Sequence, residues 1–182
     1  YFKIEGRNPD GTPNPAYENL LEVDNLIDYM LVILYGGNLD APISNFLGNS
    51  SPNNWYGQRD RTGAHGGFRF SSHDAEHTLL SVSENRTGPY SSGDSGVSKS
   101  NPQWIWQKLS ANPEFRLRVA DHIHRHFFNG GALTPEAARA RFGARTNQIY
   151  SAVVAESARW GDAKSGTPFT RNQHWLSSVN GI

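Results

Sequence analysis

Residues 24–40 read DNLIDYMLVILYGGNLD and carry the pattern on which the predicted fold is based. The apolar side chains of this stretch recur at spacings of three and four residues, which is the period of one face of an α-helix. Asp24 is suited to cap the first turn of this helix, and Gly36 with Gly37 is suited to end it. We therefore expect a buried amphipathic helix that is followed at once by Asp40. Its apolar positions are Leu26, Ile27, Met30, Leu31 and Leu34.

The second half of the chain also predicts helices. Asn112-Pro113-Glu114 combines a cap, a first-turn proline and an acidic residue, which is typical of a helix start. Similar starts recur downstream, and glycine or asparagine follows several of the expected helices. The sequence thus predicts a mainly α fold with a helical bundle or layer in this half. The expected helices cover 102–109, 112–129, 134–143, 146–161 and 170 onward.

Strand signals are few. Residues 67–73 alternate apolar and polar side chains, which predicts a short strand that delivers Asp74 at its end. Residues 1–4 alternate in the same way, like the end of a strand. Residues 38–67 and 81–101 are rich in Asn, Gly, Ser and Pro without a sustained period, so we expect loops there. The small β element therefore lies near residues 68–74.

Length and composition exclude several classes of protein. The chain has 182 residues, enough for one domain with a sizeable core, and its 17 basic residues balance its 17 acidic ones. This balance of charge gives no indication of a nucleic-acid partner or of binding to an anionic membrane. The absence of cysteine excludes disulfides and thiolate chemistry. The longest apolar run, residues 29–35, is far shorter than the about 20 residues of a membrane helix, so we expect no membrane insertion.

Asp40 is the first candidate for chemistry. A carboxylate between a buried helix and a long loop is held on one side and open to solvent on the other, as a base that receives a hydroxyl group requires. Aspartate is also well suited to form the turn before Pro42, and this structural interpretation stays open.

Asn54 and Asp74 are candidate metal ligands. The side-chain oxygens of Asn and Asp are hard donors that suit Mg²⁺ or Ca²⁺. Asn54 is alternatively a helix cap in front of two core aromatics, Trp55 and Tyr56. A weaker hypothesis is a zinc site made of His73, Asp74 and His77. His122, His124 and His126 spread around a helix, so we expect them on the surface or partly packed.

The order of several motifs resembles that of the CotH kinase family, the atypical protein kinases similar to spore coat protein H. The resemblance extends across nearly the whole chain and implies the C-terminal lobe of an atypical protein-kinase-like fold. It also implies binding of ATP with Mg²⁺ or Mn²⁺ and phosphate transfer to a protein substrate. The motifs are Asp24 to Met30, Gly37 to Asp40, Asn53 to Tyr56, Phe68 to Phe70 with His73 to Glu76, and Asn129 to Pro135.

Position by position, the resemblance assigns four site residues. Asp40 matches the catalytic aspartate, Asp74 matches the metal-binding aspartate, and Asn54 is the second metal ligand. Phe68 stands at an aromatic position of the family and is assigned to cofactor binding. Ala41 and His73 replace tryptophans that are usual in the family.

Three further expectations come from the resemblance. The family's nucleotide-binding lobe is expected upstream of residue 1, so the chain would be the C-terminal lobe, residues 1–182, and inactive alone. The extra segment Ile43 to Pro52 could displace Asn54 from a metal. Family members sit in spore coats or on bacterial surfaces, so we expect an extracellular or cell-surface location. The alternative function is a non-enzymatic adhesion or structural module that has lost kinase chemistry.

Overall fold

The computed structural model describes residues 1–91 and 100–182. The chain divides into two compact units, unit 1 at Tyr1–His124 and unit 2 at Arg125–Ile182. The predicted mainly α architecture is confirmed, because the described residues form the helices α1 to α6 and one small two-stranded sheet. The surface loop expected at residues 81–101 lies partly outside the described residues.

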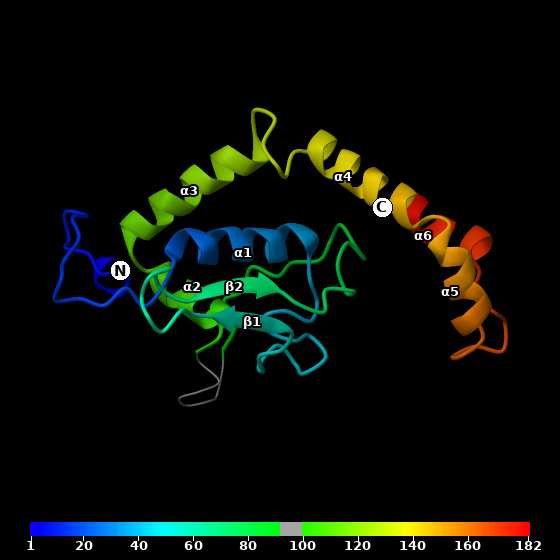
Figure 1. Ribbon diagram of the computed structural model, residues 1–182, viewed down its shortest axis with the longest axis horizontal. Helices are drawn as coiled ribbons and strands as arrows, with labels where there is room; N and C mark the ends of the chain where they lie inside the picture. Colours follow the sequence, from blue (N-terminus) through cyan, green and yellow to red (C-terminus); the bar gives the residue numbers. More distant parts are fainter. Residues whose placement is uncertain (92–99) are drawn as a thin grey trace. The chain divides into compact units, whose positions relative to one another are not determined.

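Unit 1 is built around one buried helix. Helix α1 packs against strand β2 and helix α2, as Figure 1 shows. Phe115 of α3 is fully buried and meets Trp106 of α2 edge-on, with ring centroids 5.4 Å apart. The elements of this unit are η1 (Phe2–Ile4), α1 (Val23–Gly36), β1 (Trp55–Gln58), β2 (Arg69–Ser72), α2 (Pro102–Leu109) and α3 (Pro113–Phe127), whose last residues belong to unit 2.

The ends of α1 follow from its sequence. Gly37 adopts the left-handed conformation at φ 57°, and the N–H groups of Gly37 and Asn38 bond to the carbonyls of Leu34 and Ile33. This is a Schellman ending, which satisfies carbonyl groups that the helix leaves unpaired. The predicted cap is wrong by two residues, since Glu22 is the N-cap and Asp24 lies in the first turn. An acidic residue there still interacts favourably with the helix dipole.

The sheet is the hairpin of β1 and β2. The strands are antiparallel, and Trp55 pairs with Ser72 while Gln58 pairs with Arg69. Asn25 of α1 fixes this hairpin, because its amide bonds to both the N–H and the carbonyl of Phe70, at 2.5 and 3.1 Å. The strand predicted before Asp74 is confirmed as β2, whereas β1 lies inside the segment predicted as a loop.

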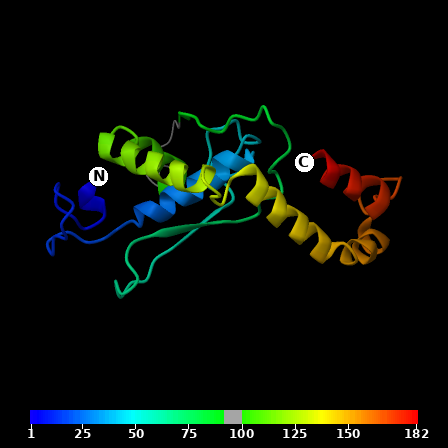
Figure 2. The ribbon, with the colours of Figure 1, turned by 90° about the horizontal axis from the view of Figure 1, so that it is seen from above.

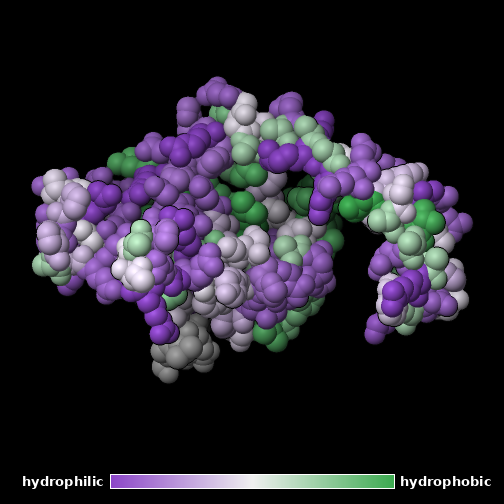
Figure 3. Space-filling model, viewed as in Figure 1, coloured by the Kyte–Doolittle hydropathy of each residue, from purple (hydrophilic) through white to green (hydrophobic). Residues whose placement is uncertain are grey.

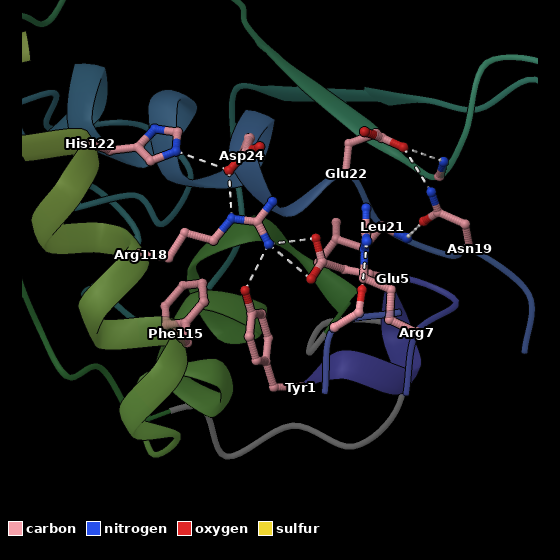
Figure 4. Close-up of polar contacts among 12 residues, drawn as sticks. Tyr1, Glu5, Arg7, Asn19, Leu21, Glu22, Asp24, Phe115, Arg118 and His122 are labelled. Carbon is pink, nitrogen blue, oxygen red and sulfur yellow. Dashed lines mark hydrogen bonds and ion pairs between the residues drawn. The ribbon is translucent and has the colours of Figure 1, made fainter. Parts of the chain in front are cut away.

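Arg118 of α3 ties the start of the chain to the core (Figure 4). Its guanidinium bonds to the Tyr1 hydroxyl at 2.7 Å, to Glu5 at 2.7 Å and to Asp24 at 2.6 Å. The predicted strand end is wrong, and Phe2–Ile4 forms the single turn η1 instead.

His122 is buried, contrary to the prediction of a surface or partly packed side chain. It is 4% exposed, and its two ring nitrogens lie 2.9 Å from Asp24 and 2.6 Å from Asp28. Both acids stand on α1 four residues apart, so they present carboxylates on one face of that helix. The free-energy cost of burying the polar ring of His122 is therefore offset by its contacts with the two acids of α1.

Unit 2 is helical throughout its regular elements (Figure 2). Thr134 and Thr170 cap helices with their hydroxyls, as predicted. The predicted break at Gly143 is wrong, because α4 continues through it and ends at Ile149. Neighbouring strong helix formers such as Ala and Arg offset the cost of one glycine, about 1 kcal/mol. The elements are α4 (Pro135–Ile149), α5 (Ala152–Trp160), η3 (Arg171–Trp175) and α6 (Leu176–Gly181).

On the face shown in Figure 3, hydrophilic side chains predominate over the N-terminal segment and α3 of unit 1. In the described part of the chain, no helix combines the length and the apolar character that spanning a membrane demands.

Candidate active site

Asp40 lies in a tight turn that the end of α1 positions. The buried Asn38 side chain accepts the backbone N–H of Asp40 at 2.9 Å. The neighbouring Leu39 N–H bonds to the His77 carbonyl at 3.0 Å. The turn is thus anchored to the rigid helix on one side and to the segment after Asp74 on the other.

The carboxylate of Asp40 is almost buried and is held by three side-chain donors. It is 9% exposed. Its Oδ1 accepts the hydroxyl of Ser44, and its Oδ2 accepts the amides of Asn53 at 3.0 Å and Asn54 at 2.9 Å. Neutral donors satisfy an ionised carboxylate without cancelling its charge, so Asp40 is oriented as an acceptor. The turn-forming interpretation alone does not account for this shell of donors.

Asn54 also contacts the backbone of Asp74, next to the Asp40 carboxylate. Its Nδ2 also lies 3.3 Å from the backbone carbonyl of Asp74, so one amide connects both predicted acids. The structure therefore gathers Asp40, Asn54 and Asp74 in one cluster of unit 1. Asp74 is exposed, and among the described residues its carboxylate has no hydrogen bond or ion pair.

The backbone at this cluster is in a rare conformation. Asn54 has φ 44° and Asp74 has φ 47°, both in the left-handed region. Asn and Asp tolerate that region better than other side chains, but it still costs free energy unless the surroundings impose it. Such outliers gather at functional sites, and here they flank the hairpin, one before β1 and one after β2.

The inserted segment leaves the Asn54 amide within hydrogen-bond reach of Asp40. Ile43 and Pro52 pair as an isolated antiparallel bridge. The N–H of Ser44 bonds to the carbonyl of Ser51 at 3.0 Å, and that of Asn53 bonds to the carbonyl of Pro42 at 3.0 Å. We call residues Ile43 to Pro52 the excursion. Because its two ends meet, the chain returns to Asp40 with both amides in reach.

Phe68 lies apart from the carboxylate cluster. It precedes β2, whereas Asp74 follows that strand, so the two residues stand at opposite ends of it. Phe68 is 44% exposed and lines a cavity of about 530 Å³. Aromatic rings and aliphatic side chains dominate its walls, a lining typical of ligand pockets. The other lining residues are Ile4, Leu20, Leu21, Trp55, Phe70, Ser100 and Ile105.

The donor set at the cluster fits a hard cation. The free carboxylate of Asp74 and the amide oxygen of Asn54 are oxygen ligands, which Mg²⁺ and Mn²⁺ favour. The zinc hypothesis gains no support. In residues 1–91 and 100–182, no group of three ligand atoms within 4.8 Å of one another includes His73, Asp74 and His77. The ring of His77 packs instead on Phe46, at 4.8 Å between centroids.

Sequence reasoning missed two members of this site. Ser44 reaches Asp40 from inside the excursion, and Asn53 donates beside Asn54. The paired asparagines were visible in the sequence, but only one was assigned a role. No sequence signal marked Ser44, because its contact depends on how the excursion closes.

Comparison with known families agrees with the order of the motifs. A family model described as CotH kinase protein matches residues 3–180, nearly the whole chain. No curated protein and no solved structure matches. The match spans Asp40, Asn54, Phe68 and Asp74 as well as the helices of unit 2. The resemblance drawn from the motifs is therefore confirmed, and the chain belongs to the CotH kinase family.

Proposed function

We propose that this chain carries the catalytic and metal-binding groups of an atypical protein kinase. The reaction would transfer the γ-phosphate of ATP to a protein hydroxyl in the presence of Mg²⁺ or Mn²⁺. The observation that carries this proposal is the amide of Asn54, which links the Asp40 carboxylate to the backbone of Asp74. Family membership supports the same class of reaction.

Asp40 is proposed to orient the acceptor hydroxyl and receive its proton. An ionised carboxylate offers roughly four acceptor positions, and Ser44, Asn53 and Asn54 fill three of them. The remaining position on Oδ1 suits an incoming hydroxyl. A fixed carboxylate lowers the barrier chiefly by positioning, which is the main contribution of the protein in phosphoryl transfer.

Asp74 and Asn54 are proposed to hold the divalent cation through their side-chain oxygens. When bound, the cation neutralises charge on the phosphate groups. Asp74 contributes a charged ligand, and Asn54 contributes a neutral one while its NH₂ group stays bonded to Asp40. The exposure of Asp74 leaves its carboxylate open to a ligand from solvent.

Phe68 is proposed to contact the nucleotide base at the apolar cavity that it lines. Base and aromatic ring would stack, which is favourable for any nucleobase. The phosphates need further donors, and we propose that an upstream lobe of the same polypeptide supplies them. The 182-residue chain alone would then bind ATP weakly and show no turnover.

Phosphate transfer by the longest natural polypeptide that contains this chain tests the proposal. Asp40→Ala and Asp74→Ala should each lower the rate by about 100-fold or more, the first through loss of the base and the second through loss of a ligand of the cation. Asp121→Ala, at an exposed position of α3, is the matched control and should keep the rate. Transfer that survives in both site variants would overturn the proposal, whereas no transfer by the unsubstituted polypeptide would favour a non-enzymatic module.

A further inference from the structure

Arg86 is a buried cation in unit 1 beside the excursion. It is 4% exposed, although a guanidinium is among the groups least often buried. Burial of a charge is costly unless its hydrogen bonds are satisfied. The contacts that hold Arg86 in place therefore show what it stabilises.

Two of those contacts go to opposite limbs of the excursion. Nη2 of Arg86 donates to the backbone carbonyl of Ile43, and Nη1 donates to the side chain of Asn49 at 2.8 Å. Glu84 stands 3.8 Å from Nη1, and the Tyr90 ring centroid lies 5.3 Å from the guanidinium carbon. The guanidinium thus joins the outgoing limb at Ile43 to the returning limb at Asn49, while its Nε is buried without a hydrogen-bond partner in the described part of the chain.

The two limbs that Arg86 joins lead to the side chains that donate hydrogen bonds to Asp40. Ser44 follows Ile43 directly and gives its hydroxyl to Asp40 Oδ1. Asn53 follows the end of the excursion and gives its amide to Oδ2. A shift of either limb would therefore move a donor away from the carboxylate.

We propose that Arg86 is a positioning residue for Asp40. It closes the excursion, so that Ser44, Asn53 and Asn54 keep the carboxylate in one orientation. The link runs from the guanidinium through Ile43 and Ser44 to Asp40. The catalytic consequence of this link rests on the proposed kinase function, whereas the structural link does not.

The decisive variant is Arg86→Lys, which keeps the charge but cannot hold both limbs with a planar fork. In the 182-residue chain, nuclear magnetic resonance should show shifted or broadened side-chain amide signals of Asn53 and Asn54. In the longest natural polypeptide, the turnover number should fall about 10-fold, as for other supporting shells, while KM for ATP changes less than about twofold. Arg118→Lys is the control, because its partners are Tyr1, Glu5 and Asp24.

Asn49→Gly keeps the inference falsifiable if Arg86→Lys does not fold. Asn49 has φ 57°, so glycine tolerates its backbone conformation while it removes the acceptor of Nη1 together with an exposed hydrogen bond to Asn45. The side-chain amide signals of Asn53 and Asn54 should shift in the same direction as in Arg86→Lys, but by a smaller amount. Unchanged Asn53 and Asn54 signals in a folded variant would overturn the inference. If instead the unsubstituted protein transfers no phosphate, the kinase proposal fails while the amide signals still decide the role of Arg86.

Discussion

Asn54 donates a hydrogen bond of 2.9 Å to the carboxylate of Asp40, which lies 14 positions earlier in the chain. The intervening excursion is closed by the bridge between Ile43 and Pro52. The same Asn54 amide reaches the Asp74 carbonyl. A single side chain therefore connects the carboxylate of Asp40 with the backbone of Asp74, two residues that belong to different segments.

Variants of Asn54 should separate the role of its side chain from that of its backbone. Asn54→Ala and Asn54→Gly both remove the amide, but only alanine is strained at φ 44°. Both should weaken Mn²⁺ binding about 10-fold or more, because each loses a ligand and a support of Asp40. In thermal unfolding, Asn54→Gly should be at least as stable as Asn54→Ala.

Calorimetric titration of Mn²⁺ in the presence of ATP measures the first effect. If Asn54→Gly bound the ion as tightly as the unsubstituted chain does, Asn54 would not be a ligand.

Two neighbouring glycines of α1 should respond differently to the same substitution. A Cβ at Gly37, with φ 57°, would lie 3.2 Å from the Cβ of Glu84, and the left-handed conformation alone costs about 1–2 kcal/mol. A Cβ at Gly36 would make ordinary contact with Thr78, at 3.5 Å. Gly37→Ala should therefore destabilise unit 1, and Gly36→Ala should be neutral or stabilising by a few tenths of a kcal/mol.

Urea unfolding of the two variants checks this pair. Equal free energies of unfolding would show that Gly37 is not held in the left-handed region.

Phe115 should be a main contributor to the stability of unit 1. It is fully buried and contacts the rings of Tyr1 and Trp106. Phe115→Ala should cost about 3–5 kcal/mol through lost burial and the cavity that remains. Leu117→Ala, two residues away on the same helix and 62% exposed, should change stability by less than about 0.5 kcal/mol. Similar losses for both variants would contradict the assigned core.

Asp24 should make the stability of unit 1 depend on pH in the acid range. Its hydrogen bond with Arg118 holds the pKa of Asp24 below the usual value of 3.8. A carboxyl group with a lower pKa in the folded state stabilises fully above its unfolded pKa. That stabilisation is lost as the pH falls through the folded pKa.

The test compares the chain with Asp24→Asn by urea unfolding at several pH values. The difference in unfolding free energy should shrink as the pH falls below about pH 4. A difference that stays constant down to about pH 2 would contradict the proposed pairing.

The helices were predictable because their signals are local. The apolar period of residues 24–34 and the caps at Thr134 and Thr170 depend on neighbouring residues, and the structure confirms them. The strand β1 was not predictable from its sequence, since its four residues gain regularity from pairing with β2. At Gly143 the error is of the opposite kind. The sequence predicted that this glycine ends a helix, whereas α4 continues through it because the neighbouring residues favour the helix.

The residue types of the candidate site could be chosen from the sequence, whereas the residues that support them could not. Asp40, Asn54 and Asp74 stood out as hard oxygen donors within family motifs. Ser44 and Arg86 did not, because their roles depend on tertiary contacts, and the bond from Arg86 to Ile43 joins residues 43 positions apart. His122 likewise pairs with acids 94 and 98 positions away. Contacts between residues so far apart in the chain produce no periodic pattern in a single sequence.

Paramagnetic broadening by Mn²⁺ tests the central claim most directly. Mn²⁺ with ATP is added to the isotope-labelled chain, and the loss of each amide signal is followed by nuclear magnetic resonance. A shared cation site predicts that the signals of Asp40, Asn54 and Asp74 disappear first and together, and that Asp74→Ala abolishes this selectivity. Broadening that is centred elsewhere, or that spares Asp40 while Asp74 is affected, would contradict the account.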